Sequence, residues 1–365
     1  MDSIYLDCNA TMPIRPEVLE LVGQVMQETG NTSSVHHFGR RARAHTEQAR
    51  EAVANLTGVR PQQVAFNSGA TEANNTVLSA FRESPVLISA IEHPSVFKNA
   101  PQARMIPVTK DGVVDLEAFE KILKEGKPPA LVSVMLVNSE TGVVQPVKEI
   151  AALVRETGAL VHTDAVQAAG RIALDFEDLG VDFMSLSAHK MGGPQGVGCL
   201  VIREGADLPS FMCGGGHEQG RRAGTLNTAG IAGFGLAAKL AQQNLGTWEK
   251  IEKLRDHLEK ELQKTAPEAV IYGQNVPRVG NTSNIGLPGV PAQTQLMALD
   301  LEGIAVSSGS ACSSGAFKPS HVLTAMGADE DAAKSALRIS LGWATTADEI
   351  ERFIEAWSNI YQRTA

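Results

Sequence analysis

The chain has 365 residues, which is too many for one small hydrophobic core and suits two domains. Its net charge of −9 argues against a general nucleic-acid surface, because phosphate binding needs a basic excess. The longest apolar stretches fall well short of the ~20 residues that span a bilayer, and the first residues lack a signal-peptide pattern.

The four cysteines, Cys8, Cys199, Cys213 and Cys312, lie far apart in the chain. None has the CxxC spacing of a thiolate metal site, and the set does not suggest a disulfide framework. We therefore expect a protein of the reducing cytoplasm with neither a membrane nor a nucleic acid as partner.

Short segments rich in Val, Ile and Leu alternate with helical segments along the first two thirds of the chain. This alternation predicts an α/β fold with a mostly parallel sheet and helices on both faces. The predicted strands are Gln63–Asn67, Val86–Ile91, Met105–Val108, Leu131–Val137, Leu160–Thr163, Phe183–Ser187 and Gly198–Ile202.

Beyond about residue 230 the pattern changes to two long predicted helices, Ile231–Leu245 and Thr247–Thr265. A region rich in Gly, Pro and Asn follows (Gly273–Pro291), then strand-like pieces and an amphipathic helix near Asp348–Arg363. We expect a large α/β domain over residues 13–250. Residues 1–12 and 251–365 together would form a smaller α+β domain.

A glycine-containing turn over Asn67–Asn75 joins the predicted strand Val64–Phe66 to a predicted helix. Free backbone N–H groups and the positive end of a helix form an anion site, and the hydroxyl of Thr71 would be a further donor. Turns of this kind are individually weak signals, because many are only helix starts.

His93 also follows a predicted strand. Its pKa lies near neutrality, so it could stack on a flat cofactor and move protons. A single histidine at the end of a strand is otherwise more often structural.

Asp164 stands at the end of the strand Leu160–Thr163, and it precedes Lys190 by 26 residues. That is about one strand–helix–strand unit, which would bring both residues to the same edge of the sheet. Such a pair suits a cofactor that contains a pyridine ring. The carboxylate of Asp164 would keep the ring nitrogen protonated, and Gln167 could bond a phenolic oxygen on the same ring. Asp164 as a plain helix cap is the common alternative, but it does not account for the lysine.

Lys190 lies just past the predicted strand Phe183–Ser187, at the edge where open α/β sheets bind ligands. Two glycines and a proline follow it closely and would let the backbone approach a ligand. A Schiff-base lysine must be partly desolvated so that its amine can be neutral. A surface lysine would be the better reading if the segment stood alone, but the three strand-end signals support one another.

Cys312 lies in the segment Val306–Gly315, which otherwise contains only Val, Ser, Gly and Ala. A buried structural cysteine usually has apolar neighbours. This one stands on a small, polar segment suited to a thiol that attacks in one place and delivers its product elsewhere. A benign exposed cysteine is the alternative if the other motifs are set aside.

Together these segments resemble the cysteine desulfurases of the NifS/IscS type, which are class V, fold-type I enzymes that use pyridoxal phosphate (PLP). Two positions depart from the usual pattern, since Cys8 stands where members have Asn and Met12 where they have Thr. Besides the Asp164, Lys190 and Cys312 segments, the matching segments are Tyr5–Thr11, Asn31–His36, Ser68–Asn74, Glu92–His93, Asn138–Gly142, Gly214–Glu218, Arg222–Thr225 and Leu337–Gly342.

The resemblance implies that Lys190 holds PLP covalently and that Asp164 pairs with its ring nitrogen. Gln167 and Asn138 would hold the phenolic side of the ring, and His93 would stack on it. The remaining implied contacts are Ala70, Thr71, Ser187 and His189 for the phosphate, Thr225 for the phosphate of the partner subunit in a homodimer, and Asn9, Asn138 and Arg338 for the substrate. Arg338 would pair with the substrate carboxylate, for which a guanidinium is well suited.

The implied reaction removes sulfur from L-cysteine. Lys190 would take the α-proton, and the thiolate of Cys312 would attack the substrate sulfur, leaving a persulfide and releasing L-alanine. An iron–sulfur scaffold or another acceptor protein would collect the sulfur. No catalytic metal is expected, although Cys312 could ligate a transferred iron–sulfur cluster.

Two other enzymes stay open, a class V PLP aminotransferase and a selenocysteine lyase. These would share Lys190, Asp164 and the phosphate site but need no thiol, so Cys312 distinguishes them. A third reading is an inactive scaffold that keeps the fold for partner binding.

Overall fold

The computed structural model describes residues 3–125, 127–309 and 318–364. Within these ranges the main sheet has seven strands in the order β2-β8-β7-β6-β5-β3-β4. Their bounds are β2 (Val64–Asn67), β3 (Val86–Ser89), β4 (Arg104–Ile106), β5 (Leu131–Ser133), β6 (Leu160–Asp164), β7 (Phe183–Ser187) and β8 (Gly198–Ile202). Strands β3 to β7 are parallel, whereas β8 runs antiparallel between β2 and β7. The prediction of a mostly parallel sheet is confirmed.

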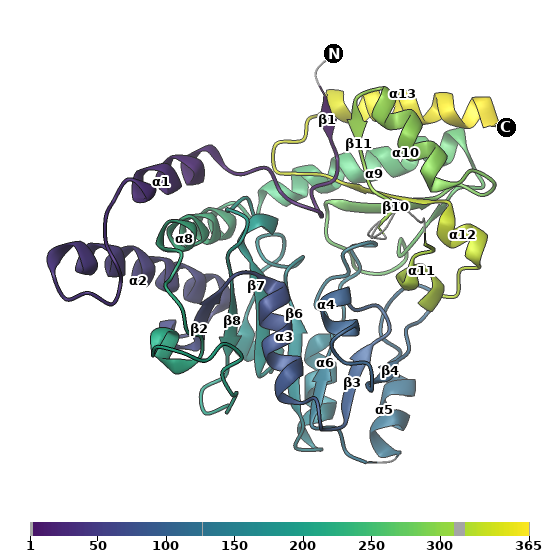
Figure 1. Cartoon of the computed structure of the whole chain (residues 1–365). Helices are drawn as coiled ribbons and strands as arrows, with labels where there is room; N and C mark the ends of the chain where they lie inside the picture. Colours follow the sequence, from purple (N-terminus) through teal and green to yellow (C-terminus); the bar gives the residue numbers. More distant parts are fainter. Residues whose placement is uncertain (1–2, 126, 310–317, 365) are drawn as a thin grey trace.

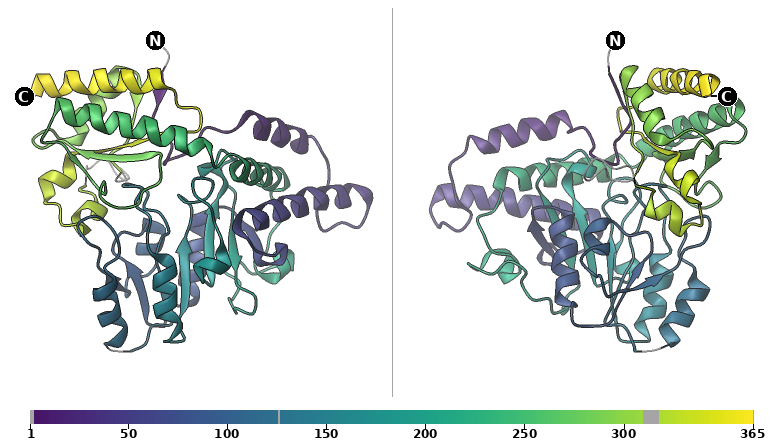
Figure 2. Two further views of the ribbon diagram at one scale, coloured as in Figure 1. Left: turned by 180° about the vertical axis from the view of Figure 1, so that it is seen from behind. Right: turned by 45° about the vertical axis from the view of Figure 1, so that its right-hand side comes forward.

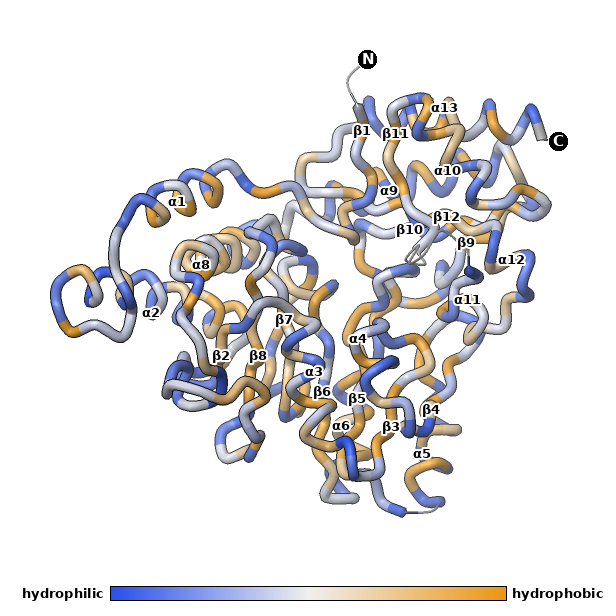
Figure 3. Tube along the Cα trace, in the orientation of Figure 1, coloured by the Kyte–Doolittle hydropathy of each residue, from blue (hydrophilic) through white to orange (hydrophobic). Residues whose placement is uncertain are grey.

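Helices cover both faces of this sheet (Figure 1). They are α3 (Ala70–Ala80), α4 (Pro94–Phe97), α5 (Leu116–Lys124), α6 (Val147–Arg155) and α7 (Phe176–Leu179). Helix α6 shows why they pack there, since Val147, Ile150, Ala151 and Val154 form one buried stripe at helical spacing. Figure 3 shows the same division, with apolar strands inside and polar turns outside.

Helices α1 (Pro16–Met26), α2 (His37–Thr57) and α8 (Thr228–Gln243) lie side by side next to the main sheet (Figures 1 and 2). The approach of α2 to α8 depends on Gly235, because a Cβ there would lie 2.4 Å from the Cα of Ala49. Only glycine allows that contact.

A second group of elements lies beyond the carboxyl ends of the parallel strands of the main sheet (Figure 1). Strand β10 (Thr282–Gly286) pairs antiparallel with β12 (Ala336–Ser340) and β9 (Val270–Ile271), and β1 (Ile4–Tyr5) pairs parallel with β11 (Ile304–Ala305). The accompanying helices are α9 (Thr247–Thr265), α10 (Ala292–Leu301), α11 (His321–Ala325), α12 (Glu330–Lys334) and α13 (Ala347–Thr364).

These elements have an apolar core of their own, which contains Ile4, Leu258, Phe353 and Trp357. A separate core of this kind supports the division into residues 13–250 and residues 1–12 plus 251–365, which we keep as a proposal. Strand β10 falls inside the Gly/Pro/Asn-rich region, where no strand was expected. Its residues are mostly polar yet fully buried. Thr282 bonds Asn9 and Asn281, and the Nδ2 of Asn284 donates to the carbonyl of Glu140.

No helix within the described ranges combines the length and the apolar composition needed to cross a membrane.

The loop after β8 contains two non-glycine residues with left-handed backbone, Glu218 (φ 48°) and Gln219 (φ 59°), a conformation that costs energy. The buried carboxylate of Glu218 accepts hydrogen bonds from Arg50 at 2.7 and 2.8 Å and from the backbone N–H of Phe66 at 2.7 Å. Arg50 also donates to the carbonyl of Val64. This buried ion pair therefore fixes the loop against β2, the strand that leads into α3.

Substituting Glu218→Gln should lower the free energy of unfolding by about 3 kcal/mol, because it removes the buried charged partner of the Arg50 guanidinium and leaves only the exposed Glu47. Urea unfolding followed by circular dichroism measures the change. Glu47→Gln is the matched control, since Glu47 also contacts Arg50 but is 52% exposed, and it should cost about 1 kcal/mol or less. Equal losses in the two variants would contradict the assignment.

Candidate active site

Asp164 and Lys190 meet at the carboxyl-end edge of the main sheet. Asp164 is the last residue of β6 and pairs in register with Ser185 of the neighbouring β7. Lys190 ends the short 3-10 turn Ala188–Lys190 that follows β7 directly. The spacing in the sequence therefore places both residues where parallel strands end, as predicted.

The amine of Lys190 donates hydrogen bonds to the carbonyls of Asn9 at 2.5 Å and Ala10 at 2.8 Å. Burial lowers the pKa of Lys190 to about 7, and the nearby positive charges of Arg338 and Arg171 act in the same direction. Near neutral pH a large fraction of the amine is therefore unprotonated. That state is what a Schiff-base lysine requires.

Asp164 is held in place from two sides. Its Oδ2 accepts from the Nδ2 of Asn74 at 2.8 Å, and its Oδ1 accepts from the backbone N–H of Val166 at 3.1 Å. The carboxylate is 7% exposed. It is thus a buried, oriented negative charge that could face a positively charged ring nitrogen.

Helix α3 begins at Ala70, directly after β2, and no side chain caps its first turn because the N-cap is Gly69. The first N–H groups of the helix are therefore available to an anion. Arg222 pairs with Glu72 of this first turn at 3.0 Å, which ties the segment that carries Thr225 to the same helix end. Arg222, three residues before Thr225, therefore lies beside the start of α3, and the contact of Thr225 with a phosphate stays a prediction.

His189 lies beside Thr11, with 3.1 Å between Nδ1 and Oγ1. Burial lowers the pKa of His189 to about 4, and Lys190 adds to this, so the ring is neutral near pH 7. Ser187 is buried at the end of β7. His189 and Ser187 frame the turn that leads to Lys190.

Gln167 is occupied by contacts within the chain. Its Nε2 donates to the carbonyl of Asn9 at 3.0 Å, and its Oε1 accepts from Arg171 at 2.5 Å. Arg171 also bonds the side chain of Asn9, and burial lowers the pKa of Arg171 to about 10. Sequence reasoning missed Arg171. The bond from Gln167 to a cofactor ring stays a prediction.

Asn138 is fully buried and orders its own turn. Its Oδ1 accepts from Glu140 and Thr141, and its Nδ2 donates to the carbonyl of Ile91 at 3.2 Å. A contact of this amide with the cofactor or the substrate stays a prediction.

Arg338 lies in β12 and reaches the same site from the sheet that β12 forms with β10 and β9. Its guanidinium donates to Asp7 at 2.6 Å and to the carbonyl of Ser139 at 3.2 Å, while its Nε is buried without a partner. Asn9 contacts the same carbonyl of Ser139 at 3.1 Å. An arginine with an unused buried donor can receive a further acceptor.

Cys312 lies outside the described residues, but the residues that flank its segment are fixed. Ser307 exchanges two backbone hydrogen bonds with Arg338, at 3.2 and 2.6 Å. On the other side, Ser320 donates to the buried carboxyl group of Glu140 at 2.6 Å. The chain therefore enters and leaves this segment next to Arg338 and Glu140.

The chemical groups that the described residues bring together fit the three functional groups of PLP. An uncapped helix start suits the phosphate, the amine of Lys190 with its lowered pKa suits the aldehyde, and the buried Asp164 suits the ring nitrogen. No group of three or more His, Cys, Asp or Glu residues that could hold a metal ion occurs among the described residues.

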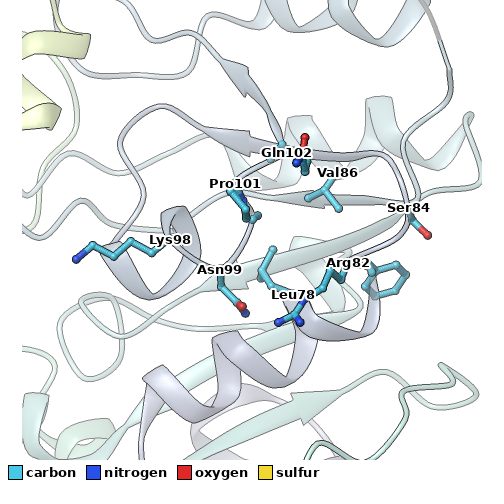
Figure 4. Close-up of a pocket in the computed structure, with 11 residues that line it drawn as sticks. Leu78, Arg82, Ser84, Val86, Lys98, Asn99, Pro101 and Gln102 are labelled. Carbon is cyan, nitrogen blue, oxygen red and sulfur yellow. The ribbon is translucent and has the colours of Figure 1, made fainter.

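A separate cavity of about 180 Å³ lies at the opposite end of α3 from Ala70 (Figure 4). The residues that line this cavity include the apolar Leu78 and Val86 and the basic Arg82 and Lys98. None of the predicted site residues lines it.

Comparison with known proteins identifies relatives along the whole chain. A family model for class-V aminotransferases matches residues 4–353. A protein named cysteine desulfurase IscS, from Dictyoglomus turgidum, is 37% identical over 99% of this chain and 95% of its own length. A cysteine desulfurase of Bradyrhizobium diazoefficiens is 41% identical over 99% of this chain and 95% of its own length. The crystal structure of a NifS-like protein from Rickettsia africae superposes with a TM-score of 0.93, at 40% identity and 99% coverage of both chains.

The pKa of Lys190 predicts how its reactivity depends on pH. The rate at which ligand-free protein condenses with PLP should rise from about pH 6 to about pH 8 and level off above, because the neutral amine is the nucleophile. Borohydride reduction and peptide mass spectrometry give the rate at Lys190, with free Nα-acetyl-lysine as the control. Modification of Lys190 that keeps rising beyond pH 9, like that of the control, would contradict the lowered pKa.

Proposed function

This chain belongs to the aminotransferase class-V family, and on that premise we propose that it is a pyridoxal-phosphate-dependent cysteine desulfurase acting on L-cysteine. One observation carries the proposal for this chain's own residues. The amine of Lys190, whose pKa burial lowers to about 7, lies at a site that also receives Arg338. Arg338 is paired through its backbone with Ser307, in the segment that carries Cys312.

Different elements of the chain would bind different chemical groups of the cofactor. Lys190 would bind it covalently, Asp164 would pair with the ring nitrogen, and His93 would stack on the ring. Ala70, Thr71, Ser187 and His189 would bind the phosphate, and Gln167 and Asn138 would contact the phenolic side. When bound, PLP supplies an electron sink that stabilises negative charge at the α-carbon of an amino acid.

The chain's own residues would then perform the remaining steps. Arg338 binds the carboxylate of L-cysteine, with Asn9 and Asn138 beside it, and the amine of Lys190 takes the α-proton. The thiolate of Cys312 attacks the substrate sulfur and forms an S–S bond while the Cβ–S bond breaks. The electron pair stays with Cβ, which takes up a proton, the amine of Lys190 returns the α-proton, and L-alanine leaves. Cys312 is then a persulfide.

A second protein would collect this sulfur, either an iron–sulfur scaffold or another acceptor. We further propose a homodimer in which Thr225 contacts the phosphate of the partner subunit. A reducing cytoplasm is the proposed location, and the free thiols of Cys8, Cys199 and Cys213 support it.

The role of Cys312 separates a desulfurase from the other class-V reactions. Cys312→Ala should keep the yellow colour of bound PLP and lose persulfide formation, because it removes only the sulfur acceptor. Absorbance, a persulfide assay and alanine release from L-cysteine measure the three properties. Cys213→Ala, which removes an exposed thiol outside the Cys312 segment, is the matched control. Undiminished alanine release by Cys312→Ala would overturn the role of this residue.

The role of Arg338 predicts a change in substrate affinity. Arg338→Lys should raise KM for L-cysteine on the order of 10- to 100-fold, because the planar, two-pronged donor is lost and a charged hydrogen bond is worth ~1.5–3 kcal/mol. Steady-state kinetics measure KM, and the visible spectrum of bound PLP is the control. A KM equal to that of the parent protein would exclude Arg338 as the carboxylate receptor.

A further inference from the structure

A chain of hydrogen bonds connects His93 with Asp164 through two residues that the proposed mechanism does not use. Asn74 donates from its Nδ2 to Oδ2 of Asp164 at 2.8 Å and to Oγ of Ser95 at 2.8 Å. The Oγ of Ser95 lies 2.8 Å from the Nδ1 of His93. The backbone N–H of Ser95 donates to the same Nδ1 at 3.1 Å.

The chemistry of the groups fixes the direction of each bond. An ionised carboxylate only accepts, so the group of Asn74 that faces Asp164 must be its NH₂. The same NH₂ donates to the hydroxyl of Ser95, which is therefore free to donate its own proton onward. A backbone N–H only donates, so the Nδ1 of His93 is an acceptor and carries no proton.

We infer that Ser95, oriented by Asn74, is a positioning residue that holds His93 in the neutral tautomer with its proton on Nε2. Two donors converge on Nδ1, and a proton there would have to oppose both. The Nε2 is then the only ring nitrogen that can present a proton to the reactants. The inference rests on the proposed function only for the role of His93 in catalysis.

Other groups act on His93 as well. Desolvation lowers the pKa of His93 below its ordinary value, and the charges of Lys190 and His321 lower it further. The carboxylate of Asp164 raises it. Ser95 contributes separately, because a donor to Nδ1 stabilises the neutral ring and disfavours the charged one. Removing the hydroxyl of Ser95 alone should therefore raise the pKa of His93.

Nuclear magnetic resonance of the holoenzyme with labelled histidine tests the inference without turnover, with the His93 signal assigned by its loss in His93→Gln. The parent protein should show His93 as the Nε2–H tautomer. In Ser95→Ala the pKa of His93 should rise by about 0.5–1 unit, the size expected for one neutral hydrogen bond. Ser95→Thr keeps the hydroxyl and should restore the parent value. Asn74→Ala should shift the pKa in the same direction but by less.

The acid limb of the pH profile of kcat/KM for alanine release should move upward with the pKa of His93 in Ser95→Ala. A proton on Nδ1 in the parent protein, or an unchanged pKa in Ser95→Ala, would overturn the inference. An unchanged pKa in Asn74→Ala alone would remove Asn74 from it. Absence of alanine release in the parent protein would instead overturn the proposed function and leave the tautomer measurement standing.

Discussion

Asn9 is the residue on which the arrangement of the site depends, because each of its polar groups is bonded to a different part of the chain. Its backbone N–H donates to Ser340 of β12, and its carbonyl accepts from Lys190 and Gln167. Its side-chain amide is bonded to Ser139, Thr282, Asn281 and Arg171. A buried polar group that loses its partner costs about 1–3 kcal/mol, so the position of Asn9, and with it that of Lys190, is determined several times over.

This arrangement explains why both sheets contribute to one site. Lys190 and Asp164 lie at the ends of main-sheet strands, whereas Arg338 comes from β12. Asn9 is bonded to both sides, to Lys190 on one and to Thr282 of β10 and Ser340 of β12 on the other. Thr282 of β10 contacts the N-terminal segment directly, since its Oγ1 accepts from the side chain of Asn9 at 2.9 Å. A strand of Thr, Ser and Asn is costly to bury, and here the bonds of Thr282 and of the Nδ2 of Asn284 offset part of that cost.

The sequence predicted the residues that follow strands, because the ends of parallel strands converge wherever the helices go. Lys190, Asp164 and Ala70 were recognisable for that reason. Arg171 was not, because its burial depends on a contact with Asn9, 162 positions away, and a basic residue in a turn normally indicates a solvated surface. The amides of Gln167 and Asn74 pose the same difficulty, since local sequence gives the residue type but not which of several neighbours it bonds. The segment of Cys312 is a different case, as it was predicted from composition and family likeness.

The ion pair between Arg338 and Asp7 has a consequence for how any carboxylate ligand binds. A ligand that reaches Arg338 does not meet an isolated cation, because an internal carboxylate already neutralises part of its charge. Association is therefore an exchange of one anion for another or a sharing between two, and its net free energy is a small difference between similar quantities. Any two ligands with the same carboxylate would face the same competition from Asp7, so this ion pair alone would not distinguish a substrate from a product that keeps its carboxylate.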